Sequence, residues 1–236
     1  PFRETFQKEQ MIPRKASLTT YSLVLSVYTL VAFHYPFASH AAGCMDGGFN
    51  SVLLALMGLT VLLALNFFFY YLLVFCLRGV GKGIVSFTLI GDAIMLYFVN
   101  NYEVLVTDEM MGNVINTQYS EASGFFSWSF VLYVLLLGVL PSVYVFARKV
   151  EYGSWKQLGS RLGIALAAIL VAVFGNMKNW PWIDRNSTEL GSLLMPWSYI
   201  VNTFRYYDSE RKKNVKEIPL PDATAASQTR DRKSVV

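Results

Sequence analysis

The feature that most constrains the fold of this chain is a long segment that is almost free of charge. Between Leu18 and Leu77 the only Asp, Glu, Lys or Arg residue is Asp46. Over the whole chain 54% of residues are hydrophobic and 15% are charged, against about 45–50% and about 25% in typical soluble domains. This imbalance excludes a disordered chain and an ordinary soluble enzyme, and it predicts an integral membrane protein.

Five apolar stretches are long enough to cross a membrane, because a helix needs about 20 residues to span the hydrocarbon core. They lie near residues 18–36, 51–77, 84–101, 126–147 and 162–178. The sequence therefore predicts an all-α membrane protein, with a transmembrane domain of five helices over residues 1–178. The aromatic-rich residues that follow 178 are expected to lie at the membrane surface and to lead into a linker that ends near residue 231.

The distribution of Lys and Arg predicts the orientation. These residues occur in the N-terminal segment, at 78–83 and at 148–161, whereas the intervening loops 37–50 and 102–125 contain neither. Cytoplasmic loops of membrane proteins carry the excess of Lys and Arg. The N-terminus is therefore expected to be cytoplasmic, and five spans would place the C-terminus outside.

The outward loop before the fourth stretch contains the residues that best suit a binding site. Thr107 and Asp108 are typical of a helix start, and Asn113, Thr117 and Glu121 follow at intervals of four, which would place them on one stripe of an interfacial helix. The amide and hydroxyl could donate to a phosphate, and the carboxylate could pair with an ammonium group. A solvated helix face would show the same spacing, so spacing alone does not decide between the two.

Several short motifs occur in an order that resembles the membrane domain of the bacterial lipid A phosphoethanolamine transferases, which include the colistin-resistance transferases. Besides Asn113, Thr117 and Glu121, the motifs are Tyr97-Phe98, Tyr102, Asp108, Met110-Met111, the segment 138–142, Val150-Glu151-Tyr152 and Met195-Pro196.

The resemblance implies a bacterial inner-membrane enzyme that moves phosphoethanolamine from phosphatidylethanolamine to lipid A or another lipopolysaccharide acceptor. It places the donor lipid near Asn113, Thr117 and Glu121. It also implies a periplasmic catalytic domain that carries the nucleophile and zinc, with residues 232–236 as its first strand. On this reading the chain as given holds no catalytic residue and no metal ligand, is inactive alone, and has no nucleic-acid partner.

Asp92 supports a different interpretation. A charge near the middle of a membrane span costs at least about 2.5 kcal/mol, and such residues often mark ion or proton pathways. The chain could therefore be a small polytopic transport or binding protein that uses Asp92. The simpler explanation is a carboxyl group hydrogen-bonded between helices, with Asn66 as a possible partner.

Overall fold

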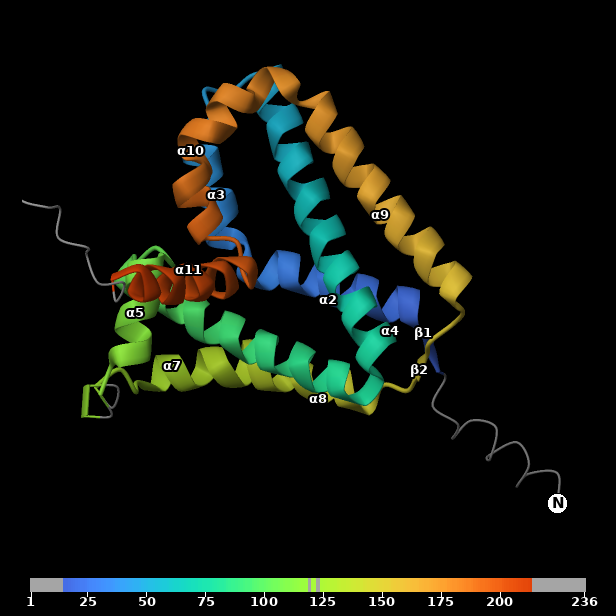
Figure 1. Ribbon diagram of the computed structural model, residues 1–236, viewed down its shortest axis with the longest axis horizontal. Coiled ribbons are helices and arrows are strands. Elements are labelled where there is room, and N and C mark those ends of the chain that lie inside the picture. The colour runs from blue at the N-terminus through green and yellow to red at the C-terminus, as the bar shows by residue number, and fades with distance from the viewer. Residues whose placement is uncertain (1–14, 119, 122–123, 214–236) are drawn as a thin grey trace, which may run out of the picture.

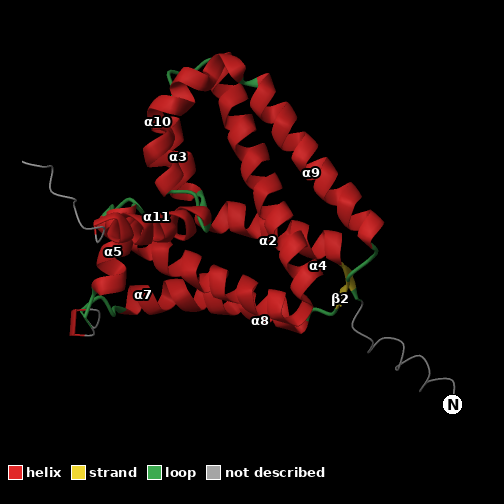
Figure 2. Cartoon of the chain, viewed as in Figure 1, coloured by secondary structure: helices red, strands yellow, loops and turns green. Residues whose placement is uncertain are grey.

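The computed structural model describes residues 15–118, 120–121 and 124–213, and this part of the chain is almost entirely helical (Figures 1 and 2). The strands among the described residues are β1 (Ala16–Ser17) and β2 (Val150–Glu151), which pair in parallel with Ala16 opposite Val150. This pair joins the start of the first helix to the segment before the last long apolar helix.

The first apolar stretch forms α2 (Leu18–Phe33), and the chain then bends by 56° into α3 (Tyr35–Gly43). The Ser17 hydroxyl caps α2 by accepting from the Thr20 amide at 3.1 Å. Pro36 explains the break at His34, because proline has no N–H for the preceding turn and its ring collides with it. The predicted span 18–36 therefore ends three residues early.

The second and third stretches form α4 (Phe49–Tyr102), which is divided at Arg78. A straight helix of 54 residues would be about 80 Å long, more than twice the thickness of the hydrocarbon core. Arg78 has φ 48° and ψ −113°, and this non-helical backbone turns the second half back along the bundle (Figure 1). The prediction of a loop over 78–83 is wrong, because residues 79–83 are helical and Arg78 alone makes the turn.

The fourth stretch is a continuous rod made of α7 (Trp128–Tyr133), the π-helix η1 (Val134–Val139) and α8 (Leu140–Ala147). The fifth forms α9 (Trp155–Gly175), which begins before the predicted residue 162. The reason is a capping box, in which the Ser154 hydroxyl accepts from the Gln157 amide and the Gln157 side chain accepts from the Ser154 amide.

By length and apolarity, the described residues contain three helices able to cross a membrane: α4, the rod Trp128–Ala147, and α9. The number rises to four if the bent pair α2 and α3 is one span, and α4 is counted once although Arg78 divides it.

The residues after α9 are also helical. They form η2 (Met177–Asn179), α10 (Trp180–Ser192) and α11 (Trp197–Lys213). The linker predicted to end near residue 231 begins only after 213, because the basic run 211–213 completes α11, where Lys212 pairs with Asp208 and Lys213 with Glu210. Cations suit the C-terminal end of a helix dipole. The remaining linker and the expected strand 232–236 lie outside the described residues.

The helices share one core, in which tyrosine hydroxyls make hydrogen bonds between helices. Tyr21 of α2 is fully buried and donates to the carbonyl oxygen of Val145 at 3.1 Å. Tyr28 donates to the carbonyl oxygen of Leu137 at 2.7 Å, inside the π-helix. Val145 lies in the last turn of α8, where carbonyl groups have no partner within the helix. Tyr21 supplies that missing partner from α2, and Tyr28 adds a second bond between α2 and the rod.

Candidate functional site

The outer loop predicted from the sequence contains α5 (Asp108–Asn116), a short amphipathic helix. Its N-cap is Thr107, whose hydroxyl accepts from the Met110 amide at 3.2 Å, as the sequence predicts. Asp108 and Glu109 occupy the first turn, where negative charge suits the helix dipole. Asn113 is exposed on this helix.

The three polar residues predicted to share one face of a helix do not all lie on α5. This helix ends at Asn116, before Thr117 and Glu121. Thr117 is the C-cap, with an extended backbone (φ −64°, ψ 127°), and its hydroxyl donates to the carbonyl oxygen of Asn113 at 2.6 Å. Glu121 therefore does not lie on the same helix line. It follows in a separate short helical segment at residues 120–121, where its amide donates to the Gln118 carbonyl oxygen and its own carbonyl oxygen accepts from the Gly124 amide.

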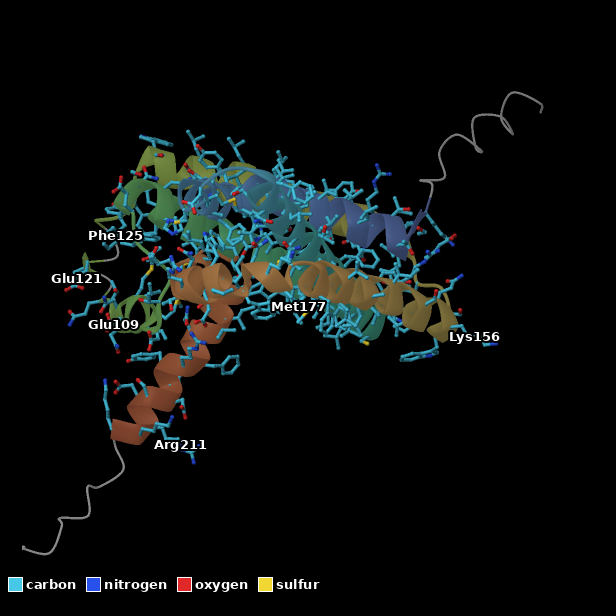
Figure 3. The ribbon with its side chains drawn as sticks, turned by 90° about the horizontal axis from the view of Figure 1, so that it is seen from above. Glu109, Glu121, Phe125, Lys156, Met177 and Arg211 are labelled. Atoms are coloured by element: carbon cyan, nitrogen blue, oxygen red, sulfur yellow. The ribbon has the colours of Figure 1, made fainter. Side chains whose placement is uncertain are left out.

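Figure 3 shows Glu121 and Glu109 at the same end of the molecule, opposite Lys156. Both side chains are exposed. The structure thus brings Asn113 and Thr117 into contact and places Glu121 after the end of α5, in a separate helical segment.

Helix α11 holds α5 in place at both ends, a contact that sequence reasoning missed. At the start of α5, the buried Asn202 side chain donates to the carbonyl oxygen of Val106. At its end, the Asn116 amide nitrogen lies 2.7 Å from the Tyr206 hydroxyl and 2.8 Å from the Gly112 carbonyl oxygen. The position of the candidate site is therefore set by a helix about 90 residues away in the sequence.

Gly112 allows this close approach. A Cβ atom at position 112 would lie 2.6 Å from Cε2 of Tyr206, closer than side chains tolerate. A glycine inside an otherwise regular amphipathic helix often marks such an approach, and this signal was available in the sequence.

We expect Gly112→Ala to loosen the contact between α5 and α11, because the Tyr206 ring must move and its contact with Asn116 weakens. Overpacking of this kind costs about 1–3 kcal/mol. Hydrogen exchange of the α5 amides measures the effect, and it should rise several-fold. Gly191→Ala is the control, because no atom lies within 4 Å of the added Cβ, and it should leave α5 unchanged.

A second set of contacts joins α10 to α3 at the same end of the molecule. His40 Nε2 lies 2.8 Å from a carboxylate oxygen of Glu189, and the Trp182 indole donates to the carbonyl oxygen of Cys44 at 2.9 Å. Helices α3, α5, α10 and α11 therefore lie together on the side of the molecule away from β1 and β2, and they are called the helical platform below (Figure 1).

Asp92 lies in the second half of α4 and is fully buried. Neither of its oxygens, nor either polar atom of the Asn66 side chain, has a hydrogen-bond partner of acceptable geometry, so the expected pair between them is absent. The Tyr199 hydroxyl interacts with the Asp92 carboxyl but donates to the Thr88 carbonyl oxygen at 3.3 Å. Burial, and after it the Asp92 carboxyl, raises the pKa of Tyr199, which keeps this hydroxyl protonated.

The described residues contain no group of three or more His, Cys, Asp or Glu side chains that could hold a metal ion. His34 is buried, and its Nδ1 lies 3.0 Å from the Thr29 carbonyl oxygen. This contact stabilises the bend between α2 and α3. The described residues therefore offer no set of ligands for the zinc that the family resemblance implies.

These features define a polytopic helical membrane protein with a helical platform at one end. Comparison with known proteins gives the family. Residues 61–211, more than half of the chain, match the family model described as phosphoethanolamine transferase EptA/EptB. The chain belongs to this family, and the transport interpretation of Asp92 is not favoured.

Individual relatives agree with the family match. The chain is 31% identical over 144 residues to phosphoethanolamine transferase EptA of Helicobacter pylori, covering 56% of this chain and 27% of that protein. It is 31% identical over 140 residues to phosphatidylethanolamine transferase Mcr-1 of Escherichia coli, covering 58% and 26%. The chain thus spans about a quarter of the length of these relatives.

The fold matches a solved structure of the same family. Lipooligosaccharide phosphoethanolamine transferase A of Neisseria meningitidis superimposes with a TM-score of 0.74 at 23% identity, over 85% of this chain and 38% of that one. The likeness confirms the helical membrane fold.

Proposed function

We propose that this chain is the membrane domain of a bacterial inner-membrane phosphoethanolamine transferase that binds the donor, phosphatidylethanolamine, at its outer end. The enzyme would pass phosphoethanolamine to lipid A or another lipopolysaccharide acceptor. The observation that carries the proposal is the family membership of a segment that includes α5 and the helix α11 that holds it.

The contacts of the three candidate residues suggest a role for each. Asn113 is exposed, and its amide nitrogen can donate to a phosphate oxygen. The Thr117 hydroxyl hydrogen is engaged by the Asn113 carbonyl oxygen, so this hydroxyl is better suited to accept from an ammonium group than to donate to phosphate. The exposed Glu121 carboxylate can make a charge-assisted hydrogen bond to the same ammonium.

The described residues offer no zinc site, and no step of transfer is assigned to them beyond donor binding and anchoring. When bound in the family's catalytic domain, zinc lowers the pKa of the nucleophile and stabilises charge on phosphorus. We expect the 236-residue chain to bind the donor without releasing diacylglycerol from it.

We also propose five membrane spans with a cytoplasmic N-terminus: α2, the two halves of α4, the rod Trp128–Ala147, and α9. Support comes from the end of the molecule where the basic segments gather. There β1 pairs with β2, the Lys82 ammonium donates to the Arg148 carbonyl oxygen, and the Arg78 guanidinium lies 5.5 Å from the Tyr152 ring. The three Lys- and Arg-bearing segments therefore meet on one side, as the positive-inside rule requires.

The topology can be tested with single cysteines at exposed positions near opposite ends of the molecule, Glu109 and Lys156 (Figure 3). In a background with Cys44→Ala and Cys76→Ala, a cysteine at 109 should react with a membrane-impermeant thiol reagent in spheroplasts. A cysteine at 156 should react only after the membrane is permeabilised. The reverse pattern would overturn both the orientation and the outward placement of α5.

The function itself is tested by expressing the full-length parent enzyme, which adds the catalytic domain that this proposal requires, in a polymyxin-sensitive bacterium and analysing its lipid A by mass spectrometry. The proposal predicts lipid A species heavier by one phosphoethanolamine group. Unmodified lipid A together with an unmodified core oligosaccharide, at confirmed expression, would contradict it.

A further inference from the structure

Two aromatic side chains near the start of α11, the helix that holds α5, reach into the membrane domain. The Trp197 ring packs edge-on against Phe69 of the first half of α4, with 5.2 Å between the ring centroids. The Tyr199 side chain reaches the second half of α4, where its hydroxyl donates to the Thr88 carbonyl oxygen at 3.3 Å. The position of α11 therefore depends on what these side chains meet inside the bundle.

The contact of Tyr199 with α4 is close and polar. A Cβ atom at Gly91 would lie 3.2 Å from the Tyr199 hydroxyl oxygen, so the absence of a side chain at 91 leaves room for this hydroxyl. The hydroxyl also interacts with the carboxyl group of the next residue, Asp92, which is fully buried. Tyr199 therefore joins α11 to an intramembrane carboxyl group.

Other hydroxyl groups near Asp92 have given their hydrogens to carbonyl oxygens, as that of Tyr199 has. Asp92 lies within electrostatic range of the Tyr28 and Tyr70 hydroxyls. The Tyr28 hydroxyl donates to the Leu137 carbonyl oxygen at 2.7 Å. It therefore has only oxygen lone pairs left to offer to Asp92.

The Tyr70 hydroxyl has likewise given its hydrogen away. It lies 2.7 Å from the hydroxyl oxygen of Thr29, and the Thr29 hydroxyl itself donates to the Leu25 carbonyl oxygen at 2.9 Å. Because a hydroxyl has one hydrogen, Tyr70 must be the donor in its contact with Thr29. The tyrosine hydroxyls that act on Asp92 can therefore accept from it and cannot donate to it.

A carboxyl group among acceptors needs a hydrogen of its own. Neither oxygen of Asp92 receives a hydrogen bond from the described residues, and none of the ion pairs that they form includes Asp92. An ionised carboxylate can only accept, whereas a neutral carboxyl group carries one O–H donor. An unpaired charge inside a membrane is also unfavourable. The neutral form is therefore the one that suits these surroundings.

We propose that Asp92 is a positioning residue for α5, because its neutral carboxyl group donates to the Tyr199 hydroxyl oxygen and thereby fixes the start of α11. Tyr199, Asn202 and Tyr206 follow at intervals of three and four residues, so they lie on one face of α11. Asn202 and Tyr206 contact α5 directly. A bond inside the membrane domain thus determines where α5 lies, whatever α5 binds.

This role differs from that of an ion or proton pathway, because it needs a hydrogen-bond donor and not a charge. Asp92→Asn keeps the shape of the side chain, and its amide group can donate to the same oxygen. Asp92→Leu has a similar size and no donor. The asparagine variant should therefore behave like the original chain, and the leucine variant should not.

Hydrogen exchange of the purified 236-residue chain in nanodiscs, resolved by peptide, measures the effect. Asp92→Leu should raise exchange of the α5 amides about fivefold, as expected for one lost hydrogen bond of net strength near the middle of the usual range. Tyr199→Phe should raise it at least as much, because it also removes the bond to the Thr88 carbonyl oxygen. The double variant should barely exceed Tyr199→Phe, since effects that act through one contact do not add.

A second measurement separates positioning from general stability. Replacing a buried polar group by an apolar one of the same shape can be neutral or stabilising, so Asp92→Leu should not lower the midpoint of unfolding in dodecyl sulfate. The amides of α9, which packs on α4 near Phe75, should keep their exchange rates. Tyr21→Phe is the control for Tyr199→Phe. It removes the hydroxyl of a buried tyrosine that bonds α8, and it should leave α5 unchanged.

Four results would overturn the proposal. Equal increases of α5 exchange in Asp92→Asn and Asp92→Leu would mean that a neutral donor is not what Asp92 supplies. Unchanged α5 exchange in Asp92→Leu would mean that α11 is held without this contact. Equal increases in α5 and α9 would mean that the substitution loosens the whole bundle. Fully additive effects of Asp92→Leu and Tyr199→Phe would mean that the two residues act independently.

Discussion

Gly81→Ala should lower the free energy of unfolding of this chain by about 2–3 kcal/mol, at the upper part of the usual range for overpacking. A Cβ atom at position 81 would lie 2.5 Å from the carbonyl oxygen of Leu73 and 3.0 Å from the Cα atom of Val74. These are backbone atoms of the first half of α4, which cannot rotate away as a side chain would. The turn at Arg78 brings the two halves of α4 together at this residue.

Gly83→Ala is the matched control. It changes the same residue type two positions further along the same helix, where nothing lies within 4 Å of the added Cβ. Alanine is favoured over glycine in a helix interior by about 1 kcal/mol, so this variant should be as stable as the original chain or slightly more so. Unfolding of the purified chain in mixed micelles with increasing dodecyl sulfate, followed by circular dichroism, measures both. Equal midpoints would mean that the two halves are not packed as described.

Gly81 also shows which part of the fold can be predicted from the sequence alone. Three glycines close together between two apolar stretches predict a loop, because glycine weakens helices. In the structure the same residues are helical, and Gly81 is needed for a contact with residues of the preceding helix. Apolar length predicts that helices exist, but it does not tell a flexible loop from a tight contact between two helices.

For the candidate site as well, local features could be predicted from the sequence and contacts between distant segments could not. The cap at Thr107 follows from local sequence and is confirmed. The end of α5 at Asn116 was not predicted, because a spacing of four residues fits any continuing helix. The contacts of Asn202 and Tyr206 with α5 join residues about 90–100 positions apart, and no local pattern encodes such a pairing.

Glu121→Gln should reduce transfer of phosphoethanolamine about tenfold when the donor is below saturation. The substitution keeps the size of the side chain and removes its charge, so it weakens a charge-assisted hydrogen bond to the ethanolamine ammonium. Such bonds contribute about 1.5–3 kcal/mol, and the lower value applies because Glu121 is exposed. A loss of about 1.4 kcal/mol corresponds to a factor of ten.

Asn113→Ala and Thr117→Ala should each cost less than Glu121→Gln, since neutral hydrogen bonds contribute about 0.5–1.5 kcal/mol. The bond between Thr117 and the Asn113 carbonyl oxygen adds a specific expectation. Thr117→Ser keeps this hydroxyl and should retain activity, whereas Thr117→Val removes it at similar size and should lose activity to about the same modest extent as Thr117→Ala.

Glu109→Gln is the control for Glu121→Gln, because both carboxylates are exposed at the same end of the molecule (Figure 3). The measurement is transfer from labelled phosphatidylethanolamine in membranes of cells that express the full-length parent enzyme, at matched protein levels. Glu109→Gln should stay within about twofold of the original, as expected for a surface charge that makes no strong pair. If the two glutamine variants are equally active, the charge at 121 takes no part in donor binding, and the polar residues of this loop are only its solvated surface.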